Sequence, residues 1–187
     1  MRRKENVDKK LIESFKELAK KTPIEKITIQ EIAEGAGVIR PTFYNHFQDK
    51  YQLLEHIFTS EVIKPVKPLI QNDMLDNAVV LIFVQMLKDK EFYSRVYRLQ
   101  GQNSFESIVK NSLYEMLLDF IQESSQNKVS RYKLLSHEML ASYYSEFLGF
   151  IFITWIQDGM IVPPQEMKNL FNYIKDHSLY EIVREME

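Results

Sequence analysis

Apolar residues recur every three or four positions along most of the chain, which is the spacing of one face of an α-helix. Near the N-terminus, Leu11, Phe15 and Leu18 form such a stripe. Prolines, glycines and short polar segments separate each stripe from the next. The pattern predicts about nine helices, near residues 6–21, 28–34, 38–47, 49–62, 75–87, 92–99, 104–123, 132–158 and 164–176.

Two of the predicted helices are short and are joined by a Gly-Ala-Gly turn that ends at Gly37. Thr28 is a suitable N-cap for the first of them, and glycine readily adopts the backbone conformation of a sharp turn. In the second helix, Phe43 and Phe47 are four residues apart and share one face, which leaves polar residues on the other. A helix-turn-helix needs this layout, because one face holds the unit together and the other enters the major groove of DNA.

The most apolar stretch is the run from Phe147 to Ile156. Its β-branched and aromatic residues are also compatible with a buried strand, but no partner strand is evident and helical spacing continues on both sides. We therefore expect a helix that is buried on almost all sides. Ten residues are too few to span a bilayer.

Charge is distributed unevenly along the 187 residues. The net charge of −2 argues against a protein that coats nucleic acid nonspecifically. Residues 1–50 carry 11 Lys and Arg against 8 Asp and Glu, whereas residues 51–187 carry 13 against 18. A modestly basic N-terminal module on an acidic body is consistent with DNA contact at one end.

The chain has no cysteine, so disulfides, thiolate chemistry and cysteine-based zinc sites are excluded. The N-terminus is charged and lacks the apolar run of a signal peptide. We expect a soluble, cytoplasmic protein.

The segment from Gly37 to Lys50 reads GVIRPTFYNHFQDK. It resembles the recognition segment of TetR-type (TetR/AcrR) bacterial transcriptional regulators, which typically reads G-V-S-x-x-T-F-Y-x-H-F-x-x-K. The resemblance covers about the first third of the chain. It implies an all-α protein with a three-helix helix-turn-helix DNA-binding domain at residues 1–48 and a helical effector-binding and dimerisation domain at residues 49–187. It also implies a homodimer on a near-palindromic operator, a repressor more often than an activator, and release by a small effector.

The residues and the resemblance together indicate eight DNA-binding positions: Thr28, Arg40, Pro41, Thr42, Tyr44, Asn45, His46 and Lys50. Arg40 is the candidate for base readout, because its planar fork matches the O6/N7 edge of guanine. Pro41 presets the first helical turn and can contact a thymine methyl group, and Thr42 can reach a base or a phosphate. The alternative for Arg40 is a solvated surface arginine, and for Thr28 it is plain capping rather than phosphate binding.

Tyr44 and His46 stand where the family contacts backbone phosphate, and the alternative is that they only pack. Asn45 can equally point to solvent. Lys50 lies in the first turn of a helix, where a cation is unfavourable unless a phosphate is near. The basic arm Arg2–Lys4 can add DNA contacts or be a disordered terminus.

One position departs from the family motif. Ile39 stands where the family usually has serine or threonine, and isoleucine can neither cap the recognition helix nor bind phosphate. We expect the first N–H groups of that helix to lack a side-chain partner in the DNA-free protein.

The resemblance further implies an effector pocket and a dimer interface in the C-terminal part. The pocket candidates are Phe83, Met86, Tyr93, Tyr97, Phe105, Tyr114, Tyr143 and Phe147, and they imply an apolar or amphipathic small effector. The interface candidates, on the last two long helices, are Tyr144, Leu148, Ile151, Trp155, Met167, Leu170 and Ile174. For both sets the alternative is ordinary core within one chain, because helical spacing alone explains their burial.

Catalysis is not expected. The four histidines are scattered, and there is no metal-binding spacing, phosphate-binding glycine loop or nucleophile elbow. We expect no enzyme activity, no metal, no cofactor and no membrane partner. The alternative function is a co-regulator with the same fold, whose C-terminal part binds a protein instead of a small molecule.

Overall fold

The computed structural model describes residues 2–126, 128 and 130–185. Within these ranges the structure is helical and contains no strand, which confirms the predicted all-α fold. The described residues form two more helices than the nine predicted. α5 forms separately after Pro65, and α11 follows the expected last helix. The bounds are α1 Arg2–Ala19, α2 Ile29–Gly35, α3 Arg40–Tyr44, α4 Lys50–Phe58, α5 Lys67–Gln71, α6 Leu75–Lys88, α7 Lys90–Val96, α8 Phe105–Ser124, α9 His137–Gln157, α10 Pro164–Asp176 and α11 Leu179–Glu185.

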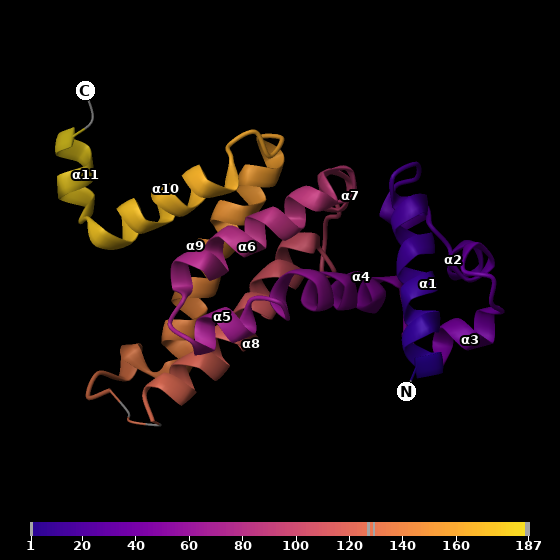
Figure 1. Ribbon diagram of the computed structural model, residues 1–187, viewed down its shortest axis with the longest axis horizontal. Coiled ribbons are helices and arrows are strands. Elements are labelled where there is room, and N and C mark those ends of the chain that lie inside the picture. Colours follow the sequence, from indigo (N-terminus) through magenta and orange to yellow (C-terminus); the bar gives the residue numbers. More distant parts are fainter. Residues whose placement is uncertain (1, 127, 129, 186–187) are drawn as a thin grey trace.

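Helices α1 to α3 form a small unit at one end of the molecule, here called the head (Figure 1). α1 packs on α2, and α2 packs on α3. Phe15, Ile32 and Phe43, one from each helix, are fully buried, so the apolar stripes meet as predicted. The Ser14 hydroxyl donates a hydrogen bond of 2.8 Å to the carbonyl of Ile32 and ties α1 to α2.

The turn between α2 and α3 depends on two glycines for different reasons. Gly37 has a φ of +68°, in the left-handed region that favours glycine. Gly35 lies where α1 and α2 approach closely, and a Cβ added there would be 2.3 Å from Oγ of Ser14. The predicted glycine turn is therefore confirmed, and it also allows close helix packing.

α4 runs from the head into the rest of the molecule, and the elements from Thr59 to α11 are here called the body (Figure 1). Asp49 caps its N-terminus, since one carboxylate oxygen accepts the N–H groups of Tyr51 and Gln52 at 2.8 Å each. The helical path continues through a π-helical turn, η2 (Thr59–Ile63), before Pro65 ends it. Such turns are rare in helices and often mark functional regions.

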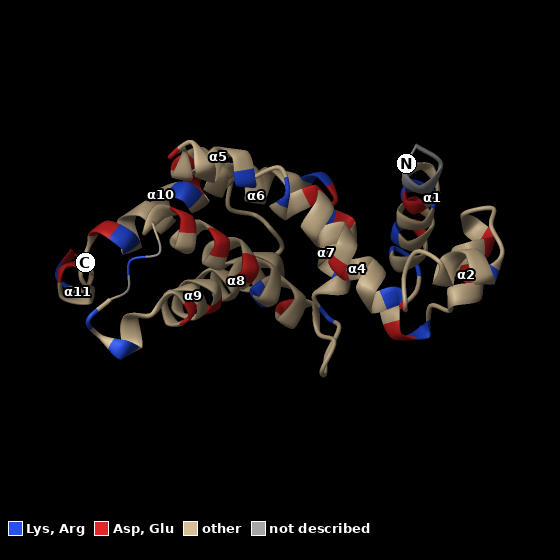
Figure 2. Cartoon of the chain, turned by 90° about the horizontal axis from the view of Figure 1, so that it is seen from below, with Lys and Arg blue, Asp and Glu red and all other residues tan. Residues whose placement is uncertain are grey.

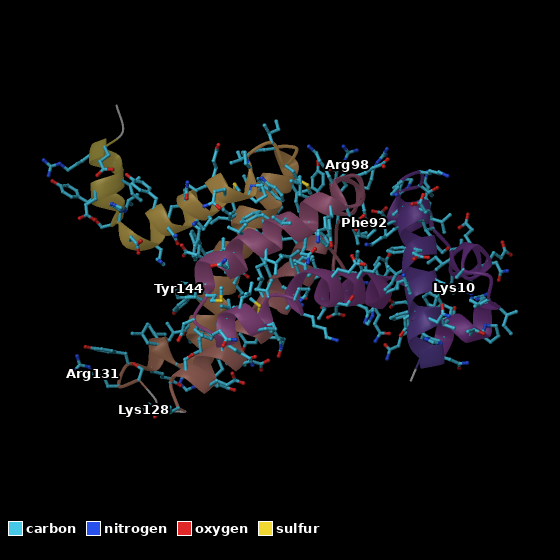
Figure 3. The ribbon with its side chains drawn as sticks, viewed as in Figure 1. Lys10, Phe92, Arg98, Lys128, Arg131 and Tyr144 are labelled. Carbon is cyan, nitrogen blue, oxygen red and sulfur yellow. The ribbon has the colours of Figure 1, made fainter. Side chains whose placement is uncertain are left out.

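One lysine of the head joins two elements of the body. The Lys16 ammonium lies 2.5 Å from a carboxylate oxygen of Glu61 in η2 and 2.7 Å from one of Asp89, which precedes α7. It also lies 5.6 Å from the centre of the Phe92 ring, and Phe92 meets Phe15 edge-on. Figure 3 shows Phe92 on the side of α7 that faces α1.

The core of the body lies between α6, α8 and α9, with α8 and α9 packed along each other. Phe83 meets the rings of Phe152 and Trp155 edge-on at centroid distances of 4.8 and 4.9 Å. The run containing these last two residues is helical, so the strand alternative is wrong. Within the single chain this helix is not buried on all sides, because Phe150 is 68% exposed and Tyr144 is exposed.

α9 is long and apolar enough to cross a membrane, because its 21 residues extend well beyond the ten-residue apolar run. Half of its most apolar window is buried inside the protein. Since α9 packs along α8, it is accounted for as a core helix of the body.

Candidate DNA-binding interface

Arg40 and Tyr44 lie one turn apart on the exposed side of α3. The guanidinium of Arg40 donates a hydrogen bond of 3.0 Å to the Tyr44 hydroxyl and lies 5.5 Å from the centre of its ring. Tyr44 in turn meets the buried ring of Phe43 edge-on. This stack fixes the direction of the arginine fork, which reduces the side-chain entropy that base binding would cost.

The first turn of α3 has no side-chain cap. Ile39 is its N-cap residue, is 69% exposed and accepts no capping hydrogen bond through its side chain. The Thr42 N–H donates to the backbone carbonyl of Ile39 at 2.9 Å. Pro41 and Asn45 are exposed and Thr42 is partly exposed.

Thr28 forms a complete capping box at the N-terminus of α2. Its hydroxyl accepts the Glu31 N–H, and its own N–H and hydroxyl donate to the Glu31 carboxylate at 2.8 and 2.7 Å. These bonds from the backbone and side chain of Thr28 lower the pKa of Glu31. The capping role of Thr28 is therefore shown by its geometry, whereas its phosphate contact stays a prediction.

His46 lies at the end of the α3 turn, and most of its ring is covered. Its Nδ1 lies 2.5 Å from a carboxylate oxygen of Asp8 on α1, and 9% of its side chain is exposed. The aspartate links the recognition segment to the first helix of the head.

Lys50 is held by backbone groups of the head. Its ammonium donates to the backbone carbonyls of Glu25 and Ile27, each at 2.8 Å, and so ties the start of α4 to the segment before α2. Burial lowers the pKa of Lys50, partly offset by nearby Glu25 and Asp49. These two carbonyl acceptors are sufficient to explain why a lysine occurs in the first turn of α4, and no phosphate is needed. The DNA contact of Lys50 stays a prediction.

The charge on the head is mixed. Figure 2 shows blue and red segments interspersed on both head and body rather than one large basic surface. The side chains of Arg2, Arg3 and Lys4 lie outside the described residues. The described part of the candidate interface is therefore small and centred on α3.

The eight pocket candidates differ in their burial. Phe83, Met86, Tyr93 and Phe105 are buried core, while Tyr97, Tyr114 and Phe147 are partly buried and Tyr143 is exposed. The rings of Tyr93 and Phe105 pack at a centroid distance of 5.7 Å. Burial raises the pKa of Tyr93 well above its ordinary value, and its hydroxyl has no hydrogen-bond partner among the described residues. The burial of these side chains agrees with the alternative of ordinary core, and the effector pocket stays a prediction.

A cavity of about 650 Å³ lies instead at the junction of head and body. Its lining is mainly charged and includes Lys16, Glu61 and Asp89. Across the described ranges, no group of three or more His, Asp or Glu side chains is arranged to hold a metal ion.

The interface candidates divide into two groups. Leu148, Ile151, Trp155 and Met167 are buried in their own chain, and the Trp155 indole donates to the carbonyl of Val162 at 2.9 Å. Their burial within one chain agrees with the alternative of ordinary core, and their place in a dimer interface stays a prediction. Tyr144 and Leu170 are exposed and Ile174 is partly exposed. Figure 3 shows Tyr144 on the side of the body away from the head.

The sequence argument missed three contacts: those of Asp8 with His46, of Lys50 with the two carbonyls, and of Lys16 with Glu61 and Asp89. Each contact joins residues at least 23 positions apart, so the spacing of apolar residues along one helix cannot predict it.

The three-helix head, its glycine turn and the polar face of α3 define a helix-turn-helix regulator. Two protein-family models match the chain. The model described as bacterial regulatory proteins, tetR family, matches residues 11–57, and the model described as transcriptional regulator C-terminal region matches residues 73–178. The chain belongs to the TetR family of transcriptional regulators.

A curated relative is the HTH-type dhaKLM operon transcriptional activator DhaS of Lactococcus lactis subsp. lactis (strain IL1403), 25% identical over 96 residues. The aligned part spans about half the length of each protein, 51% in both cases.

Solved structures share the fold. The dihydroxyacetone kinase operon activator DhaS has a TM-score of 0.57 at 20% identity, covering 91% of this chain and 92% of that one. NalD, the secondary repressor of the MexAB-OprM multidrug efflux pump in Pseudomonas aeruginosa, has a TM-score of 0.62 at 17% identity, covering 90% and 94%. Thermus thermophilus FadR, a repressor in complex with lauroyl-CoA, has a TM-score of 0.60 at 14% identity, covering 87% and 89%.

Proposed function

We propose that this regulator is a cytoplasmic homodimer that reads a near-palindromic operator, with the α3 face of each head in the major groove of one half-site. The observation that carries the proposal is the exposed Arg40–Tyr44 stack, a directed guanidinium on the face that the fold offers to DNA. We keep the division at residues 48 and 49, with the head reading DNA and the remaining residues serving dimerisation and regulation.

Exposed apolar side chains support the homodimer. Tyr144 and Phe150 on α9, Leu170 on α10, and Leu179 and Tyr180 on α11 are exposed in the single chain. Surfaces of this kind commonly mark protein interaction sites. A second copy of the chain would cover them.

Repression is the proposed mode, because a dimer bound across a promoter blocks transcription. NalD and FadR are named as repressors, whereas DhaS is named as an activator. A reporter gene placed behind the selected operator distinguishes repression from activation. If this protein is a repressor, deletion of its gene raises reporter expression, and if it is an activator, deletion lowers it.

A small-molecule effector is proposed as the signal, on the analogy of FadR, whose structure contains lauroyl-CoA.

One observation favours the alternative of a protein partner. Tyr132, Leu134 and Leu135, between α8 and α9, are exposed apolar residues on the connection that carries Arg131 and Lys133.

The experiment that tests the proposed function is selection of bound duplexes from a randomised pool at about 150 mM salt, where nonspecific phosphate binding is weak. An enriched inverted repeat is the expected result. No enrichment, from protein shown to be folded and dimeric, would contradict sequence-specific binding and favour the co-regulator alternative.

Arg40→Ala tests the assignment of base readout. We expect a loss of about 1–3 kcal/mol at the cognate base and relaxed preference at one or two operator positions. Arg131→Ala is a matched control, since Arg131 also stacks on a neighbouring tyrosine, at 4.7 Å, but lies far from the head (Figure 3). A uniform loss of affinity with unchanged preference would assign Arg40 to phosphate instead.

A further inference from the structure

The helix α11 has an apolar face that its own chain leaves open. Leu179, Tyr180 and Val183 share this face and are 77%, 69% and 55% exposed. The structure describes all seven residues of α11, and none of them is buried. A helix this short is not stable alone in water, where even helices of about 12–15 residues are marginal. The apolar face of α11 therefore calls for a surface that packs on it.

A second exposed apolar segment lies at residues 130–136, here called the connection, between α8 and α9. Tyr132, Leu134 and Leu135 are exposed there, and η3 (Lys133–Leu135) has no buried residue. Figure 1 shows α11 on one side of the end of the body away from the head, and Figure 3 shows Arg131 of the connection on the other side. Because the two segments are apart in this view, they are apart in space, and neither covers the other within one chain.

The two segments carry opposite charge. The connection contains Arg131 and Lys133 and no acidic residue, so its formal charge is +2. Residues 176–185 contain three acidic residues and one basic residue, so their formal charge is −2 with the histidine neutral; these residues are Asp176, Glu181, Glu185 and Arg184. Because like charges repel, neither segment is suited to pair with the same segment of a second copy, whereas each is suited to pair with the other.

We propose that the homodimer exchanges its last helices: the apolar face of α11 from each copy packs on the connection of the second copy. The inference rests on the proposed function, since it needs the homodimer. In a two-fold dimer the contact occurs twice, because each copy both gives and receives an α11. α11 follows α10 after only His177 and Ser178, so the contact extends the exposed apolar surface that Tyr144 and Leu170 provide on α9 and α10. The exchange also assigns the apolar residues of the connection to a second copy instead of a foreign protein.

Cysteine cross-linking tests the exchange, because the chain has no cysteine of its own. The full chain carrying both Leu134→Cys and Val183→Cys is treated with a short bis-maleimide reagent, at a concentration where the wild-type chain is dimeric, and is then run on a denaturing gel. The exchange predicts covalent dimers. If α11 instead folds back on its own connection, the product is a monomer with an internal bridge. Each single-cysteine variant should stay monomeric on the gel.

A matched pair controls for collisions of an exposed helix with any exposed site. Ile161→Cys replaces Leu134→Cys in this pair, because Ile161 is 80% exposed but follows the opposite end of α9 from the connection. Little cross-linking to Val183→Cys is expected from it. Equal yields of covalent dimer from the two pairs would show that the cross-links are not specific and would overturn the exchange.

Charge reversal of the connection tests the electrostatic part of the contact. Arg131→Glu with Lys133→Glu is expected to raise the dissociation constant of the dimer by about tenfold at low salt and by less at high salt, as measured by analytical ultracentrifugation. Lys88→Glu with Lys90→Glu, at the junction of α6 and α7, reverses the same number of charges elsewhere and should leave the dissociation constant unchanged. Circular dichroism shows that each variant is folded.

The outcomes separate the exchange from the homodimer itself. A stable wild-type dimer whose cysteine pair at positions 134 and 183 gives internal bridges, or no cross-link, would overturn the exchange and leave the homodimer intact. The absence of any cross-link would also leave the connection open to a different protein. An unchanged dissociation constant on charge reversal would contradict the charge pairing and overturn the exchange. A wild-type chain that stays monomeric at every concentration would instead overturn the proposed homodimer.

Discussion

At the residue scale, the N-terminus of α3 offers a direct test of capping. Ile39 gives no side-chain acceptor, and Pro41 has no N–H, so a serine hydroxyl at position 39 would offer the Thr42 N–H a second acceptor beside the Ile39 carbonyl, to which it already donates. Ile39→Ser is expected to raise the free energy of unfolding by about 1 kcal/mol. Chemical denaturation of both proteins measures this change in the free energy of unfolding. Ile161→Ser is the control, since it removes another exposed isoleucine outside any helix; equal effects of the two substitutions would argue against capping.

Gly35 tests close packing at the same scale. An alanine Cβ at this position would lie 2.3 Å from the Ser14 hydroxyl, which donates to the Ile32 carbonyl. Gly35→Ala should displace that hydroxyl and lower the free energy of unfolding by about 1–3 kcal/mol. The double variant with Ser14→Ala is expected to lose less than the sum of the two single changes. Additive losses in denaturant titrations would show that the contact does not carry the effect.

At the element scale, Lys50 connects α4 to the segment before α2, where the sequence suggested a phosphate contact. Lys50→Met removes two charge-assisted hydrogen bonds to carbonyls, so we expect it to cost about 1–3 kcal/mol in the free energy of unfolding. If the ammonium also contacts phosphate, as the sequence predicts, the slope of operator affinity against salt should become smaller by about one per head in the variant. An unchanged slope would contradict the phosphate contact and leave Lys50 with its structural role alone.

The elements whose signals are local could be predicted from the sequence. Thr28 caps its helix as expected, and α10 occupies the expected residues 164–176. A cap is a contact between residues two or three positions apart, so its signal lies within one turn. The partners of Lys50 and His46 lie on other elements, and residue spacing cannot specify them.

At the scale of the whole molecule, apolar spacing predicted which side chains are buried but not which surface covers them. Phe83 and Trp155 were assigned to a pocket and to an interface, yet their rings meet in one core. The helical period places a residue on the inner face of its helix, whether that face meets the same chain, a ligand or a second copy. The recognition segment was easier to predict, because its turn, buried and exposed positions all lie within 14 residues.

The coupling of head and body provides the last prediction. Lys16 binds two carboxylates from different elements of the body and is 13% exposed, while Glu61 and Asp89 stay about a third exposed. Lys16→Met leaves these carboxylates without their cation, and we expect a loss of about 1–2 kcal/mol in unfolding free energy, reduced by solvent screening. A head that is held less firmly should also bind its operator more weakly, by about tenfold for a free-energy cost near 1.4 kcal/mol.

Lys110 makes the matched comparison, because it bridges Glu106 and Glu146 within the body in the same one-to-two arrangement, at 2.8 and 2.5 Å. Lys110→Met should cost similar stability but leave operator affinity unchanged, as measured by denaturant titration and fluorescence anisotropy of the same samples. If both variants weaken DNA binding equally, affinity follows overall stability. If only Lys16→Met does so, the ion pairs between α1 and the body set the position of the head, and a signal that reaches Glu61 or Asp89 has a direct route to the DNA-reading face.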